Sequence, residues 1–274
     1  MARAWGFWTR AKLGILSAYL DAFTTASKSR PERLYLDLFA GEPENQERVT
    51  LDEIRGSARV ALDTANPEFT RLRFFERPAQ AGKLEAALRA DYPGRDIQVI
   101  PGDCNRELAE VLADLRPWSA EPTFAFIDPT GPDCEWSTLE TLASFKTISS
   151  YKTELWLLFP AGMFIRMLRV DGGTVRQEDA ARITAMFGTE QWQEIYNARL
   201  RNQLDGGQAR DEYVNLMRWR LERVLGYRFS HAFDVHEERG HSIYHMIFVT
   251  DNDAGNRIMT HLYQCCPRVS ENEN

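Results

Sequence analysis

The sequence predicts an α/β protein with a doubly wound, Rossmann-like parallel sheet. Between residues 34 and 159, five short apolar runs alternate with helical patterns, which is typical of a parallel sheet with helices on both faces. The runs at 123–127 and 155–159 are apolar almost throughout, as expected for central strands covered on both sides. Two further segments, 227–235 and 242–250, flank a polar loop and predict an antiparallel hairpin.

The composition is that of an ordinary globular protein. The chain has 274 residues, of which 43% are hydrophobic, and its 33 Lys and Arg stand against 40 Asp and Glu for a formal charge of −7. This composition excludes wholesale disorder, collagen-like repeats and a small disulfide-rich fold. The acidic balance argues against non-specific adhesion to nucleic acid or anionic membranes, although it leaves room for a local basic groove.

No segment predicts a membrane span or a disulfide framework. The apolar run Leu155–Ile165 is bounded by charged residues and is well short of the ~18 residues that a transmembrane helix needs. An apolar stretch near the N-terminus follows basic residues, but its leucines have helical spacing and Asp21 interrupts it, so an amphipathic helix is the better interpretation. The four cysteines form no CxxC pair, which fits a reducing cytoplasm.

The first half of the chain alternates helix and strand. An opening helix is predicted at 8–27, and residues 42–55 are polar and charged, which predicts a loop. Each apolar run ends at glycine, proline or a carboxylate, which interrupt strands. The predicted strands are 34–39, 72–76, 97–100, 123–127 and 155–159. The predicted helices between them are 58–65, 79–90, 106–115 and 137–145.

The second half adds helices and then the hairpin. Apolar residues in 161–208 repeat at i, i+3 and i+4 before a glycine, which predicts a helical insertion with a capped helix. The residues of this pattern are Ile183, Met186, Phe187 and the cap Gly188. A long helix is expected at 210–225, a final helix at 254–263 and a disordered tail at 270–274. Five parallel strands closed by an antiparallel pair resemble the sheet plan of class I methyltransferases.

The organisation expected is one domain with an insertion, because no Ser/Gly-rich linker or internal repeat marks a boundary. The expected parts are an N-terminal helix at 1–30 packed on the core, a cofactor-binding core at 31–160, the insertion at 161–208, a completing helix, hairpin and final helix at 209–264, and a tail at 265–274.

Carboxylates stand at or just after the ends of four predicted parallel strands. They are Asp37 before Gly41, Glu76, Asp103 and Asp128. Ligands of open parallel sheets bind outside the carboxyl ends of the strands, where the strand order reverses. The sequence therefore predicts a ligand site built from these four ends.

Each of these residues fits a part of S-adenosylmethionine. Gly41 permits a tight turn whose backbone N–H groups approach the methionine end, and Asp37 is expected to hold the ligand's ammonium group directly or through water. Glu76 is expected to accept from both ribose hydroxyls. Asp103 is expected to accept from the adenine amino group while the Cys104 N–H meets a ring nitrogen. The residues predicted to contact the cofactor are Lys12, Asp37, Phe39, Ala40, Gly41, Glu76, Asp103, Cys104 and Asp128.

Each residue alone also has a simpler interpretation, because acidic residues at strand ends often only improve solubility. The four together, in order, favour a nucleotide-type site. Nicotinamide dinucleotide binding is the weaker alternative, since that fingerprint needs three glycines and an acidic residue ~20 residues on. Here Gly41 is followed by Glu42, and Glu76 comes after a long intervening segment.

Several short motifs occur in order over about residues 8 to 250. The most specific are Asp37-Leu38-Phe39-Ala40-Gly41 and, later, Phe126-Ile127-Asp128-Pro129-Thr130-Gly131. The others are Trp8, Lys12-Leu13, Tyr19-Leu20, Gly56-Ser57, Phe75-Glu76, Gly102-Asp103, Phe187-Gly188 and Trp192. Together they resemble the three-Cys-motif partner family, TcmP. The resemblance implies a fold similar to S-adenosylmethionine-dependent methyltransferases, that cofactor, and a partner protein with a three-cysteine motif. It implies no particular substrate.

The motif after the fourth strand narrows the predicted reaction. Enzymes that methylate amino groups of adenine or cytosine use Asp or Asn, two prolines and an aromatic residue that stacks on the base. Asp128 and the Pro129 carbonyl are expected to accept from such an amine, and Gly131 to let a substrate approach the backbone. The aromatic is missing from its usual place, with Trp136 as the nearest substitute. The simpler alternative is a turn after a strand.

Other features predict less. Lys12 is expected to fold over the pocket and meet the cofactor's carboxylate, with a solvated lysine as the alternative. Three groups are interpreted as incidental: the hairpin histidines, the Cys265-Cys266 pair near His261, and an arginine set expected on a solvated helix face. The histidines are His236, His241 and His245, and the arginines are Arg210, Arg218, Arg220 and Arg223. No metal site is predicted.

Three hypotheses for function follow. The first is an S-adenosylmethionine-dependent methyltransferase that acts on a nitrogen of an exposed or flipped RNA or DNA base. The second is a methyltransferase-like binding or specificity subunit of the three-Cys-motif protein, favoured by Glu42-Pro43 and the missing aromatic. The third is a metal-dependent nuclease that uses Asp37, Asp103 and Asp128, although it leaves Gly41 and Glu76 unexplained.

Overall fold

The computed structural model describes residues 4–5, 7–42, 44–47, 53–147, 149–170, 175–236 and 242–265. Its main sheet has seven strands in the order β6-β5-β2-β7-β8-β10-β9. The strands are β2 (Leu34–Asp37), β5 (Arg71–Glu76), β6 (Ile97–Pro101), β7 (Thr123–Ile127), β8 (Glu154–Phe159), β9 (Phe229–His236) and β10 (Ser242–Thr250). The first five strands in this order, from β6 through β5, β2 and β7 to β8, are parallel to one another. Strand β10 is antiparallel to both β8 and β9. The predicted fold class is confirmed.

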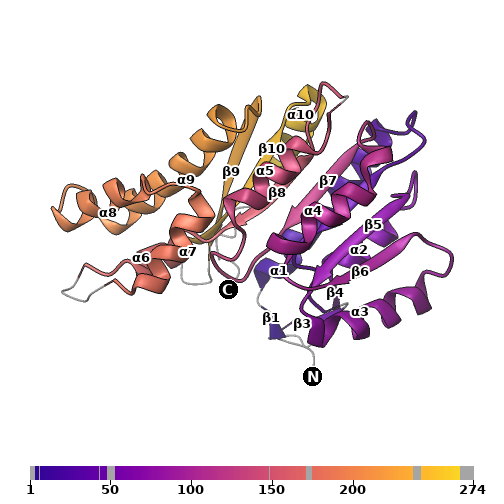
Figure 1. Cartoon of the computed structure of the whole chain (residues 1–274), viewed down its shortest axis with the longest axis horizontal. Helices are drawn as coiled ribbons and strands as arrows, with labels where there is room; N and C mark the ends of the chain where they lie inside the picture. The colour runs from indigo at the N-terminus through magenta and orange to yellow at the C-terminus, as the bar shows by residue number, and fades with distance from the viewer. Residues whose placement is uncertain are drawn as a thin grey trace, which may run out of the picture.

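Helices cover both faces of this sheet (Figure 1). One face carries α1 (Phe7–Ala26), α2 (Ser57–Asp63), α3 (Pro78–Asp91) and α10 (Asp253–Cys265). The other carries α4 (Cys104–Asp114), the short helix η1 (Arg116–Trp118), α5 (Trp136–Ser144), α6 (Ala161–Met167), α7 (Gln177–Phe187), α8 (Trp192–Leu200) and α9 (Gly206–Arg223). In Figure 1, helices α6 to α9 extend away from the parallel strands on the side of the β9–β10 hairpin.

Alternate residues of the central strands enter two separate cores. In β7, Phe124 and Phe126 pack toward α1, while Ala125 and Ile127 pack toward α4 and α5. Every residue of β7 and β8 is buried. The almost continuous apolar runs in the sequence are thus explained by a sheet that is covered on both sides.

The loop predicted at 42–55 is wrong in part. Residues of this segment form β3 (Glu44–Glu47) and β4 (Glu53–Arg55), which pair with each other and with β1 (Ala4–Trp5) in a separate three-stranded sheet. These strands are short and carry no alternating apolar pattern, so backbone pairing determines them and the sequence gives no signal.

The predicted cap of the insertion helix is confirmed. Gly188 ends α7 with a φ of 63°, in the left-handed region. A Cβ at this position would lie 2.3 Å from Cγ of Trp136, so only glycine lets the end of α7 pack on α5.

Some predictions fall on residues that the structure does not describe. These residues are Pro43, His241, Cys266 and the tail at 270–274. In the described ranges, no helix combines the length and the apolar character needed to cross a membrane.

Candidate functional site

A cavity of about 960 Å³ lies at the carboxyl ends of the parallel strands. The strand order reverses here, because β5 pairs with one side of β2 and β7 with the other. The cavity is lined by every residue predicted to contact a cofactor except Asp37. These lining residues are Lys12, Phe39, Ala40, Gly41, Glu76, Asp103, Cys104 and Asp128.

The turn after β2 forms one wall of the cavity. Gly41 has a φ of 69°, and a Cβ there would have no neighbour closer than 4.0 Å. Its N–H donates to Oε2 of Glu76 over 2.6 Å, while the Ala40 N–H donates to the Phe75 carbonyl over 3.0 Å. The turn is thus held to the end of β5, and its left-handed backbone conformation favours glycine at this position.

Glu76 is the last residue of β5 and is mostly buried at the cavity wall. Besides the bond to Gly41, its Oε1 accepts from the Arg77 N–H over 2.8 Å. Each carboxylate oxygen can accept two hydrogen bonds, so each oxygen keeps one acceptor position in this arrangement. The side chain is therefore fixed in place and still able to accept from a ligand.

Asp37 lies beneath the turn and does not line the cavity. Its carboxylate accepts from the Phe39 N–H over 3.3 Å and from the Tyr35 hydroxyl over 3.4 Å, and Ser57 is a further hydrogen-bond partner. Burial, with a smaller contribution from the nearby charge of Asp128, raises the pKa of Asp37 to about 7 against the hydrogen bonds that lower it. Asp37 thus braces the turn from within the protein.

Asp103 caps the N-terminus of α4 at the adjoining wall. Its Oδ1 accepts from the backbone N–H of Asn105 over 3.0 Å and from the Asn105 side chain over 2.9 Å. Cys104 is the first residue of the helix, so its N–H has no acceptor within the helix. Burial raises the pKa of the Cys104 thiol to about 12, which makes it a packing group.

Lys12 reaches the cavity from α1, and its Nζ forms a hydrogen-bonded ion pair with Asp128. Lys12 is buried, and Asp128 is partly buried at the end of β7. A solvated Lys12, the alternative interpretation of the sequence, is wrong. The sequence predicts both residues as cofactor contacts without pairing them, and the structure joins them in an ion pair.

The turn after β7 differs from the sequence prediction. Thr130 and Pro132 line the cavity, but Pro129 and Gly131 do not. A Cβ on Gly131 would lie 3.3 Å from Sδ of Met163 and 3.5 Å from Nη2 of Arg182. Gly131 therefore makes room for side chains of α6 and α7, and the approach of a substrate to its backbone stays a prediction.

Trp136 is not available as a stacking residue. It is buried beneath Gly188, its Nε1 donates to Glu140 over 2.6 Å, and the Arg220 guanidinium lies 4.3 Å from its ring centroid. The suggestion that Trp136 replaces the missing aromatic is wrong. Packing between α5, α7 and α9 holds this ring in the core.

Sequence reasoning missed several polar residues that line the cavity, Arg182 and Asn105 among them. Arg182 of α7 lines it and pairs with Asp133 over 2.5 Å. Asn105 ties the start of α4 to the loop before α5, since its Nδ2 donates to the Asp133 carbonyl over 2.8 Å and its Oδ1 accepts from the Glu135 N–H over 2.9 Å. Neither residue belongs to a motif, although Asn105 directly follows a predicted strand-end pair.

Several of the histidines and arginines interpreted as incidental contact other parts of the protein. His245 is buried and pairs with Asp234 across the hairpin, and Arg218 donates to the Ser230 carbonyl over 2.8 Å. Arg220 is buried over Trp136, so the prediction of a solvated face is wrong for this arginine. Among the described residues, no three His, Cys, Asp or Glu side chains are grouped so that they could hold a metal ion.

Comparison with known proteins supports the fold alone. The sequence matches no family model, and it matches no curated protein. Protein LPL1258 from Legionella pneumophila, of family DUF519, is similar at 10% identity with a TM-score of 0.50, covering 91% of this chain and 89% of that one. Its identity is too low to carry more than fold.

Two methyltransferase structures are more weakly similar. Precorrin-6y C5,15-methyltransferase from Geobacter metallireducens has 11% identity and a TM-score of 0.32, covering 84% of this chain and 85% of that one. Human methyltransferase-like protein 13, in complex with SAH, has 12% identity and a TM-score of 0.43, covering 96% and 95%. At these scores neither structure carries an argument about this chain. The fold class follows from the strand order. The fold is class I methyltransferase-like.

Proposed function

We propose that this chain is an S-adenosylmethionine-dependent methyltransferase that acts on a nitrogen of RNA or DNA together with a three-Cys-motif partner. One observation carries the proposal. The class I strand order brings the Gly41 turn, Glu76, the Asp103-Cys104 pair and Asp128 to one cavity at the strand reversal. These are the positions at which that fold places a nucleotide-type ligand.

The charge and size of the cavity fit this cofactor. Its described lining has six carboxylates and three cationic side chains, an excess of negative charge that suits a ligand with a sulfonium and an ammonium group. The lining carboxylates are Glu42, Glu76, Asp103, Asp128, Asp133 and Glu135, and the cations are Lys12, Arg77 and Arg182. The volume of about 960 Å³ lies within the usual range of ~300–1,000 Å³ for small-molecule sites.

The residues of the chain would hold the cofactor at three places. Glu76 would accept from ribose hydroxyls, Asp103 and the Cys104 N–H would meet the adenine edge, and the Gly41 turn would face the methionine end. When bound, S-adenosylmethionine supplies an electrophilic methyl group. The protein contributes orientation and exclusion of water, which suffice for an in-line displacement.

Asp128 would orient the nucleophile. Its position at the end of β7 lets it accept an N–H from an exocyclic amine, and the Lys12 ammonium holds the carboxylate in place until then. A base in a duplex would have to be exposed or flipped to reach this cavity. Lys12 would then be available to the carboxylate of the cofactor.

The partner protein is proposed from the TcmP-like motifs, in a reducing cytoplasm. A second candidate function, a binding or specificity subunit without catalysis, is favoured by one observation. No aromatic residue follows the Asp128-Pro129 pair at the usual place, and Trp136 is buried in the core. The two candidates differ in whether methyl transfer accompanies cofactor binding.

Calorimetric titration with S-adenosylmethionine and its demethylated product tests the proposal. We expect micromolar binding by the full chain and a loss of ~10–100-fold in Glu76→Ala, because a hydrogen bond to a charged group contributes ~1.5–3 kcal/mol. Glu110→Ala, on the exposed side of α4, is the matched control and should bind normally. Absence of binding by the folded protein, with and without its three-Cys-motif partner, would refute the cofactor assignment.

Methyl transfer to RNA and DNA oligonucleotides then separates the two candidates. Asp128→Ala should retain binding of the demethylated product and lose transfer by ~100-fold or more, since the acceptor that orients the nucleophile is removed. Cofactor binding without transfer to either nucleic acid, measured with the partner present, would favour the binding subunit.

A further inference from the structure

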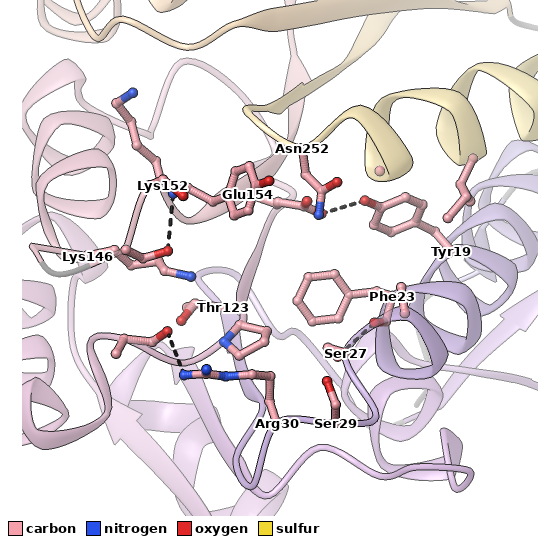
Figure 2. Close-up of a pocket in the computed structure, with 18 residues that line it drawn as sticks. Tyr19, Phe23, Ser27, Ser29, Arg30, Thr123, Lys146, Lys152, Glu154 and Asn252 are labelled. Atoms are coloured by element: carbon pink, nitrogen blue, oxygen red, sulfur yellow. Dashed lines mark hydrogen bonds between the residues drawn. The ribbon is translucent and has the colours of Figure 1, made fainter.

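A second cavity, of about 560 Å³, lies at the opposite, amino edge of the sheet (Figure 2). Its lining comes from the end of α1, the starts of β7 and β8, the segment before β8, and the start of α10. Thr123 and Glu154 are the first residues of their strands, whereas the candidate site lies at the carboxyl ends. The two cavities are therefore separated by the length of the strands. No sequence motif pointed to it.

The floor of this cavity is a buried carboxylate whose two oxygens are already engaged. Oε2 of Glu154 accepts from the Tyr19 hydroxyl over 2.5 Å, and Oε1 accepts from the Thr250 hydroxyl over 2.8 Å. Burial raises the pKa of Glu154. Helix α10 packs closely here, since a Cβ on Gly255 would lie 2.8 Å from Oε1 of Glu154. The floor is therefore closed and does not itself attract a cation.

The Lys146 ammonium points into the cavity and has no hydrogen-bond acceptor among the described residues (Figure 2). The other two cations of the lining are paired. Arg30 donates to Glu121 over 3.1 and 3.0 Å, and Lys152 contacts Asp251 over 3.2 Å. Burial lowers the pKa of Lys146 to about 8, against the charges of Glu154, Glu121 and Asp251 that raise it. Lys146 is thus a partly buried positive charge without a direct partner in the part of the chain that the structure describes.

Apolar side chains form one part of the remaining wall, beside several serine hydroxyls. Phe23 and Ala26 of α1, Pro122 before β7 and Ile258 of α10 all face the cavity. Figure 2 shows the Phe23 ring and the Lys146 ammonium on facing sides of the same space. An occupant with an apolar body and a single anionic group would contact both.

We propose that this cavity binds a small organic carboxylate, whose apolar body packs on Phe23 and whose carboxylate pairs with Lys146. An unpaired, partly buried ammonium is unfavourable, and an anionic ligand would supply its missing partner. The single ammonium suits a carboxylate, whereas a phosphate group is usually met by several donors. The volume suits a molecule of a few rings or a short chain.

The experiment follows Lys146 directly. Reductive ¹³C-methylation of the full chain gives one NMR signal per lysine, and Lys146→Met identifies the signal of interest by its loss. Titration with sodium benzoate should raise the pKa of this lysine by about one unit, with half-saturation near ~1 mM. The exposed Lys28 is the internal control, and its signal should not respond.

Variants and a second anion make the outcome decisive. Ligand-observed NMR should show that Lys146→Met loses benzoate binding at least tenfold, while Lys146→Arg and Lys28→Met retain it. Inorganic phosphate, which has no apolar body, should act only at much higher concentration. A Lys146 signal that ignores benzoate, equal binding by Lys146→Met, or a response to phosphate at benzoate's concentration would each overturn the proposal.

Discussion

Two buried carboxylates, Asp37 and Glu154, occupy matching positions at opposite edges of the sheet. Asp37 ends β2 at the carboxyl edge, and Glu154 begins β8 at the amino edge. Each is bonded to a tyrosine hydroxyl and has a serine or threonine hydroxyl as a second partner, and burial raises the pKa of each. At both edges, a buried carboxylate thus accepts hydrogen bonds from the same kinds of hydroxyl groups.

The cavities beside these acids differ in charge. At the carboxyl edge the described lining has more carboxylates than cations, and Lys12 and Arg182 are both paired. At the amino edge the described lining has three cations and one carboxylate, and Lys146 has no described partner. The comparison teaches that the balance of charge around a cavity, rather than one buried acid, indicates the class of ligand.

Asp37→Asn should give the largest effect. The pKa of Asp37 rises from 3.8 to about 7 on folding, so the folded state holds its proton more tightly and stability falls as pH rises from about 4 to about 7. A rise of three pKa units corresponds to about 4 kcal/mol. Between pH 4 and pH 8, the free energy of unfolding of Asp37→Asn should therefore gain up to about 4 kcal/mol relative to wild type.

Urea unfolding at these two pH values measures the difference. Asp114→Asn, at the exposed end of α4, should follow the wild-type profile. Parallel profiles for Asp37→Asn and wild type would show that ionisation of Asp37 costs the folded protein no stability. Asp37 would then not share with Glu154 a pKa that burial raises.

Replacing Lys12 and replacing Lys146 with methionine should change the free energy of unfolding in opposite directions. Lys12→Met leaves the partly buried Asp128 without its ion-pair partner and should destabilise the protein by about 2 kcal/mol at pH 7. Lys146→Met removes an unpaired, desolvated charge and should stabilise it by about 1 kcal/mol. Thermal unfolding of both variants checks the signs, and destabilisation by Lys146→Met would contradict an unmatched charge at the amino edge.

Alanine substitutions at two glycines should have the smallest effects on stability, and they distinguish a loss of stability from a loss of cofactor binding. Gly41 and Gly226 have φ values of 69° and 71°, and a Cβ on either would meet no atom closer than 3.8 Å. Alanine at either position should therefore cost only about 1 kcal/mol from backbone strain. Calorimetry should show weaker S-adenosylmethionine binding for Gly41→Ala alone. An equal loss in Gly226→Ala would mean that the effect is general destabilisation.

The sequence predicted the strands of the main sheet and their carboxyl ends because local signals define both. Continuous apolar runs mark β7 and β8, and glycine, proline and carboxylates mark where the strands stop. Given the parallel sheet, topology alone brings Glu76, Asp103 and Asp128 to one edge. This is why the cavity could be anticipated from single residues far apart in the chain.

The parts that escaped prediction depend on packing between distant segments. Helix orientation decides that Trp136 is buried, that Gly131 faces Met163 and that Arg182 reaches the cavity, and no local pattern encodes orientation. The Lys12–Asp128 pair joins residues that the sequence separates by 116 positions. The amino-edge cavity collects residues from several segments without a motif, so only the folded chain reveals it.

Helix α1 runs behind the sheet from one edge to the other (Figure 1). Its 20 residues span about 30 Å, with Lys12 in the wall of one cavity and Tyr19 and Phe23 in the wall of the other. A single helix thus contributes side chains to the walls of both cavities. A ligand that tilted α1 at one edge would change the affinity at the other, and thermodynamic reciprocity would make that coupling equal in both directions.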